Sequence, residues 1–147
     1  MTKSLVTGGS GFIGSHIVDY LVDKGHDVVA IDNRSANNDR FYENDQVVYT
    51  RGDITDYSAM KKAVKGVDYV FHLAAESRLQ PAIENPIEAV TKNCVGTTVM
   101  LQAAREEGVK RFVYSSTSSG YGNNPPPSVE TQPDDCLNPY SVSKVNG

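Results

Sequence analysis

A tyrosine and a lysine stand four residues apart in the stretch 138–144, near the end of this 147-residue sequence. Asn138 is a good N-cap and Pro139 a good first helical residue, so Tyr140 and Lys144 are expected one turn apart on the same helix face. A tyrosine hydroxyl beside an ammonium loses its proton below its ordinary pKa of about 10. The pair therefore predicts acid–base chemistry, although the same spacing also arises by chance and in ordinary helix packing.

A glycine-rich turn near the N-terminus predicts a phosphate site. An apolar strand at 5–7 runs through glycines at 8, 9, 11 and 14 into a helix with one apolar stripe. Glycine permits a tight turn, lets the backbone approach a pyrophosphate and allows close helix–strand packing, while the helix N-terminus offers free N–H groups. A lone glycine triplet is a weak signal. Here a second strand, 27–31, ends at Asp32, where dinucleotide-binding units hold the adenosine ribose, so the combination predicts a dinucleotide site.

Composition is that of one ordinary globular domain, 1–147, with 39% hydrophobic and 22% charged residues. The net charge of −4 argues against nucleic acid or an anionic membrane as partner. Neither a signal peptide nor an apolar run of transmembrane length is visible, which predicts a cytoplasmic location. The two cysteines and three histidines lack the spacing of metal ligands, so no metal site is expected.

Strands and helices alternate along the chain, which predicts an α/β fold with a doubly wound parallel sheet, the Rossmann fold. The polar run 34–44 is expected to be a loop or a short irregular helix. Prolines interrupt the connection at 81 and 86, and a proline-rich loop surrounds 125–127. Periodicity predicts further strands at 46–50, 67–73 and 111–115, and helices at 57–65 and 87–107.

Eight motifs follow one another in an order that is specific to one family. They are Thr7 to Gly14, Asp32-Asn33, Asp53-Ile54, His72 to Ala75, Asn93 ahead of Gly96-Thr97, Ser115 to Thr117, Tyr121-Gly122, and Tyr140-x-x-x-Lys144. Over the whole chain the sequence resembles the extended short-chain dehydrogenase/reductases of the NAD-dependent epimerase/dehydratase family. It is most similar to the nucleotide-sugar epimerases of the UDP-glucose 4-epimerase type.

The resemblance implies that NAD is the cofactor and lies along the glycine turn and the strand ends. The residues implied to bind it are Gly8, Gly11, Phe12, Ile13 and Gly14 around the pyrophosphate, Asp32 and Asn33 at the adenosine ribose, Asp53 and Ile54 beside the adenine, Leu73, Ala74 and Ala75 along the cofactor, Asn93 from the long helix, and Tyr140 and Lys144.

The same resemblance implies 4-epimerisation of a UDP-hexose or a related nucleotide sugar. Tyr140 would act as acid and base, Lys144 would bind the nicotinamide ribose and lower the tyrosine pKa, and Thr117 would hydrogen-bond the reacting oxygen. Proton and hydride leave C4 of the sugar, and the transient 4-keto sugar takes hydride back on its other face. Serines at 118 and 119 lack the acids that related dehydratases and decarboxylases carry there, which leaves an epimerase or a simple reductase.

Extended members of the family are roughly twice as long, a scale that α/β domains reach, and they form homodimers. The chain is therefore expected to be truncated before the later strands and the substrate-binding region, and to be inactive alone. The alternatives are an NAD-binding module without turnover and a short-chain reductase of another carbonyl compound. An uncovered strand at 111–115 and an unpartnered long helix predict self-association or marginal stability, and the short terminal helix is expected to fray.

The residue at the end of the second strand predicts which dinucleotide is preferred. The Asp32 carboxylate accepts both ribose hydroxyls but repels a 2′-phosphate, which favours NAD over NADP. Arg34 is the counter-signal, since a guanidinium can pair with that phosphate.

Overall fold

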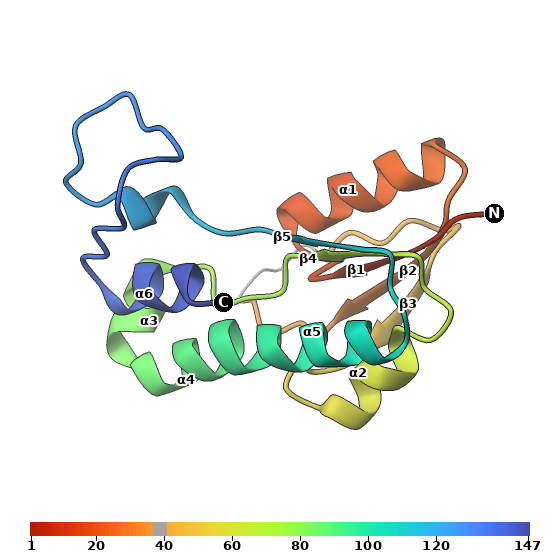
Figure 1. Ribbon diagram of the computed structural model, residues 1–147. Coiled ribbons are helices and arrows are strands. Elements are labelled where there is room, and N and C mark those ends of the chain that lie inside the picture. The colour runs from red at the N-terminus through yellow and green to blue at the C-terminus, as the bar shows by residue number, and fades with distance from the viewer. Residues whose placement is uncertain (37–40) are drawn as a thin grey trace.

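A parallel sheet forms the centre of the molecule (Figure 1). The computed structural model describes residues 1–36 and 41–147, and within them the sheet has five strands in the order β3-β2-β1-β4-β5. All neighbouring pairs are parallel, so the chain crosses β1 between β3 and β4. This topology confirms the predicted Rossmann fold, whose ligand cleft lies outside the carboxyl ends of the strands at that crossing. The strands are β1 (Lys3–Thr7), β2 (Asp27–Asp32), β3 (Val48–Arg51), β4 (Tyr69–His72) and β5 (Arg111–Tyr114).

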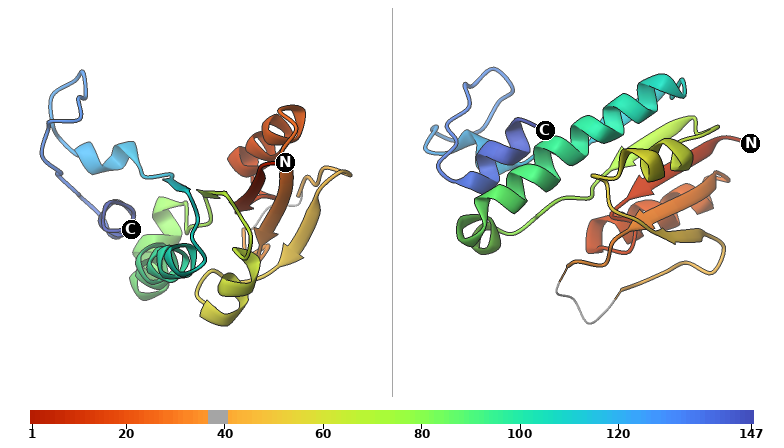
Figure 2. Two further views of the ribbon diagram at one scale, coloured as in Figure 1. Left: turned by 45° about the vertical axis from the view of Figure 1, so that its right-hand side comes forward. Right: turned by 90° about the horizontal axis from the view of Figure 1, so that it is seen from below.

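Helices cover both faces of the sheet, and Figures 1 and 2 show α1 on one face with α2 and α5 on the other. Within the described residues, none of the helices is long and apolar enough to cross a membrane. The helices are α1 (Phe12–Asp23), α2 (Tyr57–Ala63), α3 (Leu79–Glu84), α4 (Pro86–Val90), α5 (Gly96–Glu106) and α6 (Pro139–Val145).

Strand β1 contributes to an apolar core on each side of the sheet. Leu5 packs with the cluster under α2 and α5, whereas Val6 packs with Val18 and the cluster under α1. Successive side chains of a strand point to opposite faces, and both of these residues are fully buried because helices cover both faces.

The connection between β4 and β5 contains more helix than the sequence predicted. Pro81 lies in the first turn of α3 and Pro86 at the start of α4, positions whose N–H groups have no intrahelical partner to lose. The prolines therefore begin helices instead of breaking them. The predicted helix at 87–107 is one continuous rod in Figure 1, formed by α4, the π-helical turn Thr91–Val95 and α5.

The described parts of the polar run 34–44 form irregular loop, as one of the two predicted alternatives required. Residues 37–40 of that prediction lie outside the described residues.

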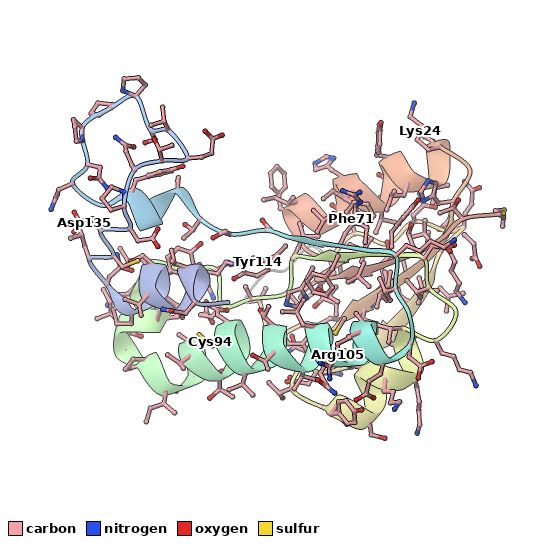
Figure 3. The ribbon with its side chains drawn as sticks, in the orientation of Figure 1. Lys24, Phe71, Cys94, Arg105, Tyr114 and Asp135 are labelled. Carbon is pink, nitrogen blue, oxygen red and sulfur yellow. The ribbon has the colours of Figure 1, made fainter. Side chains whose placement is uncertain are left out.

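Helix α6 docks onto the rest of the molecule instead of projecting from it. As predicted, Asn138 caps it: its side chain accepts a hydrogen bond from Ser141 N at 2.8 Å, and the Ser141 side chain accepts one from Asn138 N. Ser143 is fully buried, and its carbonyl accepts from the thiol of Cys94 at 3.3 Å. Figure 3 shows Cys94 on the helix that lies beneath α6. The prediction of a fraying helix took no account of this packing, which short helices need.

Candidate functional site

A cleft of about 370 Å³ opens at the carboxyl ends of the strands. The loops after all five strands and helix α6 contribute to its walls. Asn93 and Thr117 are the predicted site residues that do not line it. The predicted residues that do are Gly8, Gly11, Phe12, Ile13, Gly14, Asp32, Asn33, Asp53, Ile54, Leu73, Ala74, Ala75, Tyr140 and Lys144.

The glycine turn brings the start of α1 directly to the end of β1. Gly8 has a φ of +70°, and a Cβ there would lie 2.9 Å from Ala74 N. A Cβ on Gly14 would lie 2.0 Å from Gly8 O, so α1 can approach the turn this closely only with glycine at position 14. Gly14 thus serves the close helix packing that the sequence predicted, and Gly8 makes the predicted tight turn through a positive φ.

The N-terminus of α1 is suited to an anion. Among the described residues no side chain caps it, so its first N–H groups lie free beside the cleft. Phe12 and Ile13 follow immediately and expose 80% and 58% of their surface. A ligand that covers these apolar side chains would remove their surface from water, which favours binding. Free N–H groups and the apolar cover together fit a dinucleotide pyrophosphate.

Asp32 is held at the rim of the cleft by the backbone. Its carboxylate accepts hydrogen bonds from Ser10 N at 3.2 Å and from Arg34 N at 2.7 Å. Arg34, which has a positive φ of 55°, directs its guanidinium away to an ion pair with Glu43 and to the ring face of Phe41. The cation that could have served a 2′-phosphate is therefore paired with a carboxylate.

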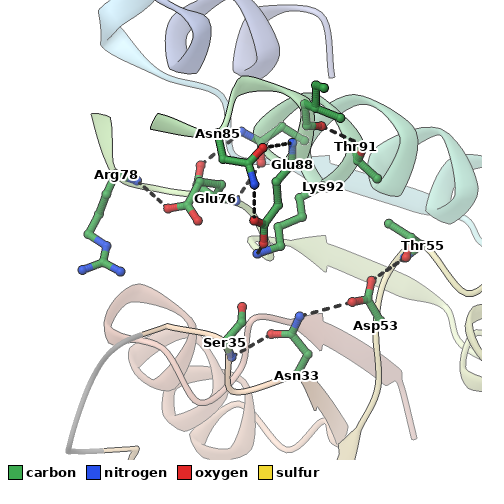
Figure 4. Close-up of polar contacts among 12 residues, drawn as sticks. Asn33, Ser35, Asp53, Thr55, Glu76, Arg78, Asn85, Glu88, Thr91 and Lys92 are labelled. Atoms are coloured by element: carbon green, nitrogen blue, oxygen red, sulfur yellow. Dashed lines mark hydrogen bonds and ion pairs between the residues drawn. The ribbon is translucent and has the colours of Figure 1, made fainter. Parts of the chain in front are cut away.

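Asp53 also lines the cleft, and Figure 4 shows its carboxylate hydrogen-bonded to the side chain of Asn33. The Asp53 carboxylate accepts from Thr55 N at 2.9 Å, from the Thr55 hydroxyl at 2.7 Å and from the Asn33 amide at 3.4 Å. Burial raises the pKa of Asp53, but these hydrogen bonds and the charge of Lys92 outweigh it and leave the pKa below its ordinary value. Asp53 is thus an ionised hydrogen-bond acceptor at neutral pH.

Lys92 lines the cleft across from Asp53 and was not predicted from the sequence. Its ammonium forms a 2.6 Å ion pair with Glu88, and Asn85 holds the other oxygen of Glu88 at 3.0 Å (Figure 4). Glu and Lys four residues apart are typical of any exposed helix surface, so the pattern gave no sign of a cleft. Its position next to Asn93 was the available signal.

Asn93 lies behind the cleft wall. It is 1% exposed, and its carboxamide accepts from Glu76 N at 2.8 Å while donating to Glu76 O at 3.1 Å and to Ser143 Oγ at 2.8 Å. The sequence predicted that Asn93 touches the cofactor, but the structure uses its polar atoms to join the loop after β4 to α6. Glu76 itself lines the cleft.

Tyr140 and Lys144 reach the far end of the cleft from α6. Lys144 is only 4% exposed, and burial lowers the pKa of its amine to about 8. Among the described residues no carboxylate lies within 4 Å of that amine. Tyr140, one helical turn earlier, is half-buried and also lines the cleft. The helix therefore presents a weakly solvated amine and a phenol to the same space.

Thr117 does not reach the cleft lining. It caps the 3-10 turn Ser118–Tyr121, and its hydroxyl accepts from Ser119 N at 3.1 Å. The two residues before it, Ser115 and Ser116, line the cleft although only Thr117 was predicted as catalytic. Their position at the carboxyl end of β5 was the sequence signal for them.

Comparison with known proteins agrees with this geometry. The sequence model of the NAD dependent epimerase/dehydratase family matches residues 4–147. The UDP-glucose 4-epimerase of Streptomyces lividans is 38% identical over 97% of this chain and 44% of its own length.

Two solved structures are also similar. The UDP-glucose 4-epimerase of Thermotoga maritima, solved with UDP-glucose, has a TM-score of 0.92 and 34% identity over 98% of this chain and 48% of its own. The Thermus thermophilus UDP-glucose 4-epimerase, in complex with NAD, has a TM-score of 0.88 and 33% identity over the same shares. The chain thus spans less than half the length of these relatives. Because the family model matches residues 4–147, the chain belongs to the NAD dependent epimerase/dehydratase family.

Proposed function

We propose that this chain is the cofactor-binding part of an NAD-dependent nucleotide-sugar 4-epimerase of the UDP-hexose class. The observation that carries the proposal is that Asp32 and the glycine turn share one cleft with Tyr140 and Lys144, although they lie far apart in the sequence. The similarity to UDP-glucose 4-epimerases supports a UDP-sugar as substrate. We assign turnover to a longer protein that has the full length of these relatives. We propose that this longer protein forms a homodimer.

The residues of the cleft suit NAD along its whole length. The α1 N-terminus would hold the pyrophosphate, Asp32 the adenosine ribose, and Asp53 the amino group of the adenine. When bound, NAD supplies the acceptor that takes hydride from C4 of the sugar and returns it, so that the sugar passes through a 4-keto form.

Tyr140 would take the proton of the sugar C4 hydroxyl as hydride leaves, and give it back when hydride returns. Lys144, which lines the same cleft, would bind the nicotinamide ribose as a hydrogen-bond donor. Thr117 would donate a hydrogen bond to the C4 oxygen, because a hydroxyl that accepts from Ser119 N can still donate its own proton. That contact requires the 3-10 turn to bring Thr117 toward the cleft.

The turn after Thr117 supports epimerisation over related chemistries. Ser118 and Ser119 are exposed there and carry no carboxylate that could protonate or deprotonate a neighbouring carbon. The second candidate is an NAD-binding module without turnover, which the position of Thr117 outside the cleft lining favours.

Tyr140→Phe, in a full-length protein containing this chain, tests the proposal. It should lower turnover of UDP-glucose by roughly two to four powers of ten, because the acid–base group is lost, with NAD binding nearly unchanged. Lys144→Ala should impair both. Tyr20→Phe, on the exposed side of α1, is the matched control and should change neither.

Three results would contradict it. Full turnover in Tyr140→Phe would remove the acid–base assignment. Absence of a dinucleotide by mass spectrometry, both in the denatured protein and after incubation with NAD, would remove the cofactor. Net oxidation of NADH without an epimerised sugar would indicate a reductase.

A further inference from the structure

Tyr114, the last residue of β5, touches Lys144 in two ways. Its hydroxyl donates a hydrogen bond to the Lys144 carbonyl at 2.8 Å, and the Lys144 amine lies 4.4 Å from the centre of its ring. Figure 3 shows Tyr114 between the sheet and α6. Tyr114 does not line the cleft, so both contacts are made from behind the wall that Lys144 forms.

The face of the Tyr114 ring is the favourable partner of the buried Lys144 ammonium. An ammonium removed from water is costly unless it finds a favourable partner, and no carboxylate of the described residues lies within ion-pair distance of Lys144. The negative face of an aromatic ring attracts a cation most strongly where water is excluded. Burial also raises the pKa of Tyr114, which keeps its hydroxyl protonated as a donor.

Tyr114 is itself fixed from below. Its ring stacks on the buried ring of His72, with centroids 5.9 Å apart and an interplanar angle of 24°. His72 is hydrogen-bonded to Thr7 at 2.7 Å and to Thr97 at 3.2 Å. A side chain stacked on such a held ring is a rigid support.

We propose that Tyr114 is a positioning residue for Lys144: its ring holds the ammonium and its hydroxyl fixes the helical turn that carries it. The inference rests on the proposed role of Lys144 at the cofactor. Tyr114 itself needs no contact with cofactor or sugar.

A measurement of the Lys144 pKa must be distinguished from the titration of the other groups near its amine. Tyr140 lies on the same helix, Tyr114 on β5 and His72 on β4, while Cys94 on the π-helical turn contacts α6. Burial keeps His72 neutral and raises the pKa values of Tyr114 and Cys94. The ring of Tyr114 can therefore be varied near pH 8 without a change of charge at His72 or Cys94.

The test is the pKa of Lys144 in this chain, measured by NMR with carbon-labelled lysine and assigned by Lys144→Met. Tyr114→Leu should lower that pKa by about one unit, because the attraction of the ring for the ammonium is lost. Tyr114→Phe keeps the ring and should leave the pKa unchanged, while amide exchange in α6 becomes faster.

Phe112→Leu is the matched control. Phe112 lies on the same face of β5 and also contacts the His72 ring, at 5.5 Å, but has no contact with Lys144, so its loss should leave the pKa in place. If Tyr114→Leu does not fold, fluorinated phenylalanines at position 114 keep the ring shape while withdrawing charge from its face. Successive fluorines should then lower the Lys144 pKa stepwise.

An unchanged or raised Lys144 pKa in Tyr114→Leu, or no trend along the fluorinated series, would overturn the inference. A rise would mean that the ring only excludes water. A fall in the pKa combined with normal NAD binding in Lys144→Met would keep the positioning role and remove the proposed function of Lys144. The two ideas can thus fail separately.

Discussion

Lys144 carries a charge at a cost in stability. Its pKa of about 8 in the folded chain lies below its ordinary value of 10.5, because burial disfavours the ammonium. The folded state is therefore penalised below pH 8 by at most about 3 kcal/mol, and the penalty disappears as pH rises from 8 to 10.5. Packing alone would not require a terminal amine at position 144. In the proposed function, the amine is a hydrogen-bond donor to a ribose.

We expect Asp32 and Arg34 to decide whether NAD or NADP binds more tightly. We expect NAD to bind at least about tenfold more tightly than NADP, since repulsion between the carboxylate and a 2′-phosphate easily exceeds 1.4 kcal/mol. Titration calorimetry with both dinucleotides measures the ratio. Asp32→Ala should lower the ratio of NAD affinity to NADP affinity. Adding Glu43→Gln to that variant releases the guanidinium of Arg34 from its ion pair and should lower the ratio further.

Arg34→Ala in the same background is the control, because it removes the released guanidinium and should cancel the effect of Glu43→Gln. Tighter binding of NADP to the unmodified chain would refute the assignment.

At the scale of the elements, a buried histidine ties together β1, β4 and α5. Thr97 donates its hydroxyl proton to Asn93 O at 2.6 Å, so it accepts from His72 Nε2, and His72 Nδ1 accepts from Thr7. The ring is therefore neutral with its proton on Nε2. Burial, together with the charge of Lys144, lowers the pKa of His72 to about 3.

Acid should destabilise the fold through this residue. The unfolded chain binds a proton at His72 near pH 6.5 and the folded chain only near 3, so stability is full above 6.5 and is lost as pH falls. The free energy of unfolding in urea should decrease by up to about 1.4 kcal/mol per pH unit below 6.5. Measurements between pH 6.5 and 5 avoid most of the titration of carboxylates.

His72→Gln is the matched variant, because an amide offers a donor and an acceptor to the two threonines without titrating. It should flatten the dependence in this window. An equally steep dependence in the variant would show that other groups cause it.

At the scale of the whole molecule, the long helix leaves an apolar surface uncovered. Ile87 is 79% exposed, and Val90, Val95 and Leu101 are between 42% and 48% exposed. In the described residues β5 is also an edge of the sheet, with one side of its backbone unpaired. Contiguous apolar surfaces and open edges are characteristic of sites of association.

We expect the chain to self-associate, and sedimentation velocity will show species heavier than the monomer. Ile87→Glu combined with Leu101→Glu should shift the distribution toward monomer, because the apolar surface becomes charged. Val129→Glu, in the loop before α6, changes a residue that is 46% exposed, close to the 45% of Leu101, and should have no effect. A monomeric wild-type chain with a sharp, high melting transition would contradict the expectation.

The sequence alone determined the local features of this protein. The roles of Gly8 and Gly14 in a tight turn and in close helix packing could be inferred from their spacing, and the strand ending at Asp32 followed from its apolar run. The N-cap at Asn138 likewise depends on neighbours within three residues. The parallel sheet followed from the alternation of strands and helices.

Tertiary structure decided everything that depends on contacts between distant segments. Asn93 was expected at the cofactor, but its carboxamide is satisfied by Glu76 and Ser143, partners that only folding brings near. Lys92 has the spacing of a surface ion pair, and only the placement of its helix across from Asp53 makes it part of the cleft. The support of Lys144 by Tyr114 joins β5 to α6 in the same way. Hydrogen bonding and burial at these positions are properties of the folded chain, because short-range pattern carries no information about which distant partner will satisfy a polar group.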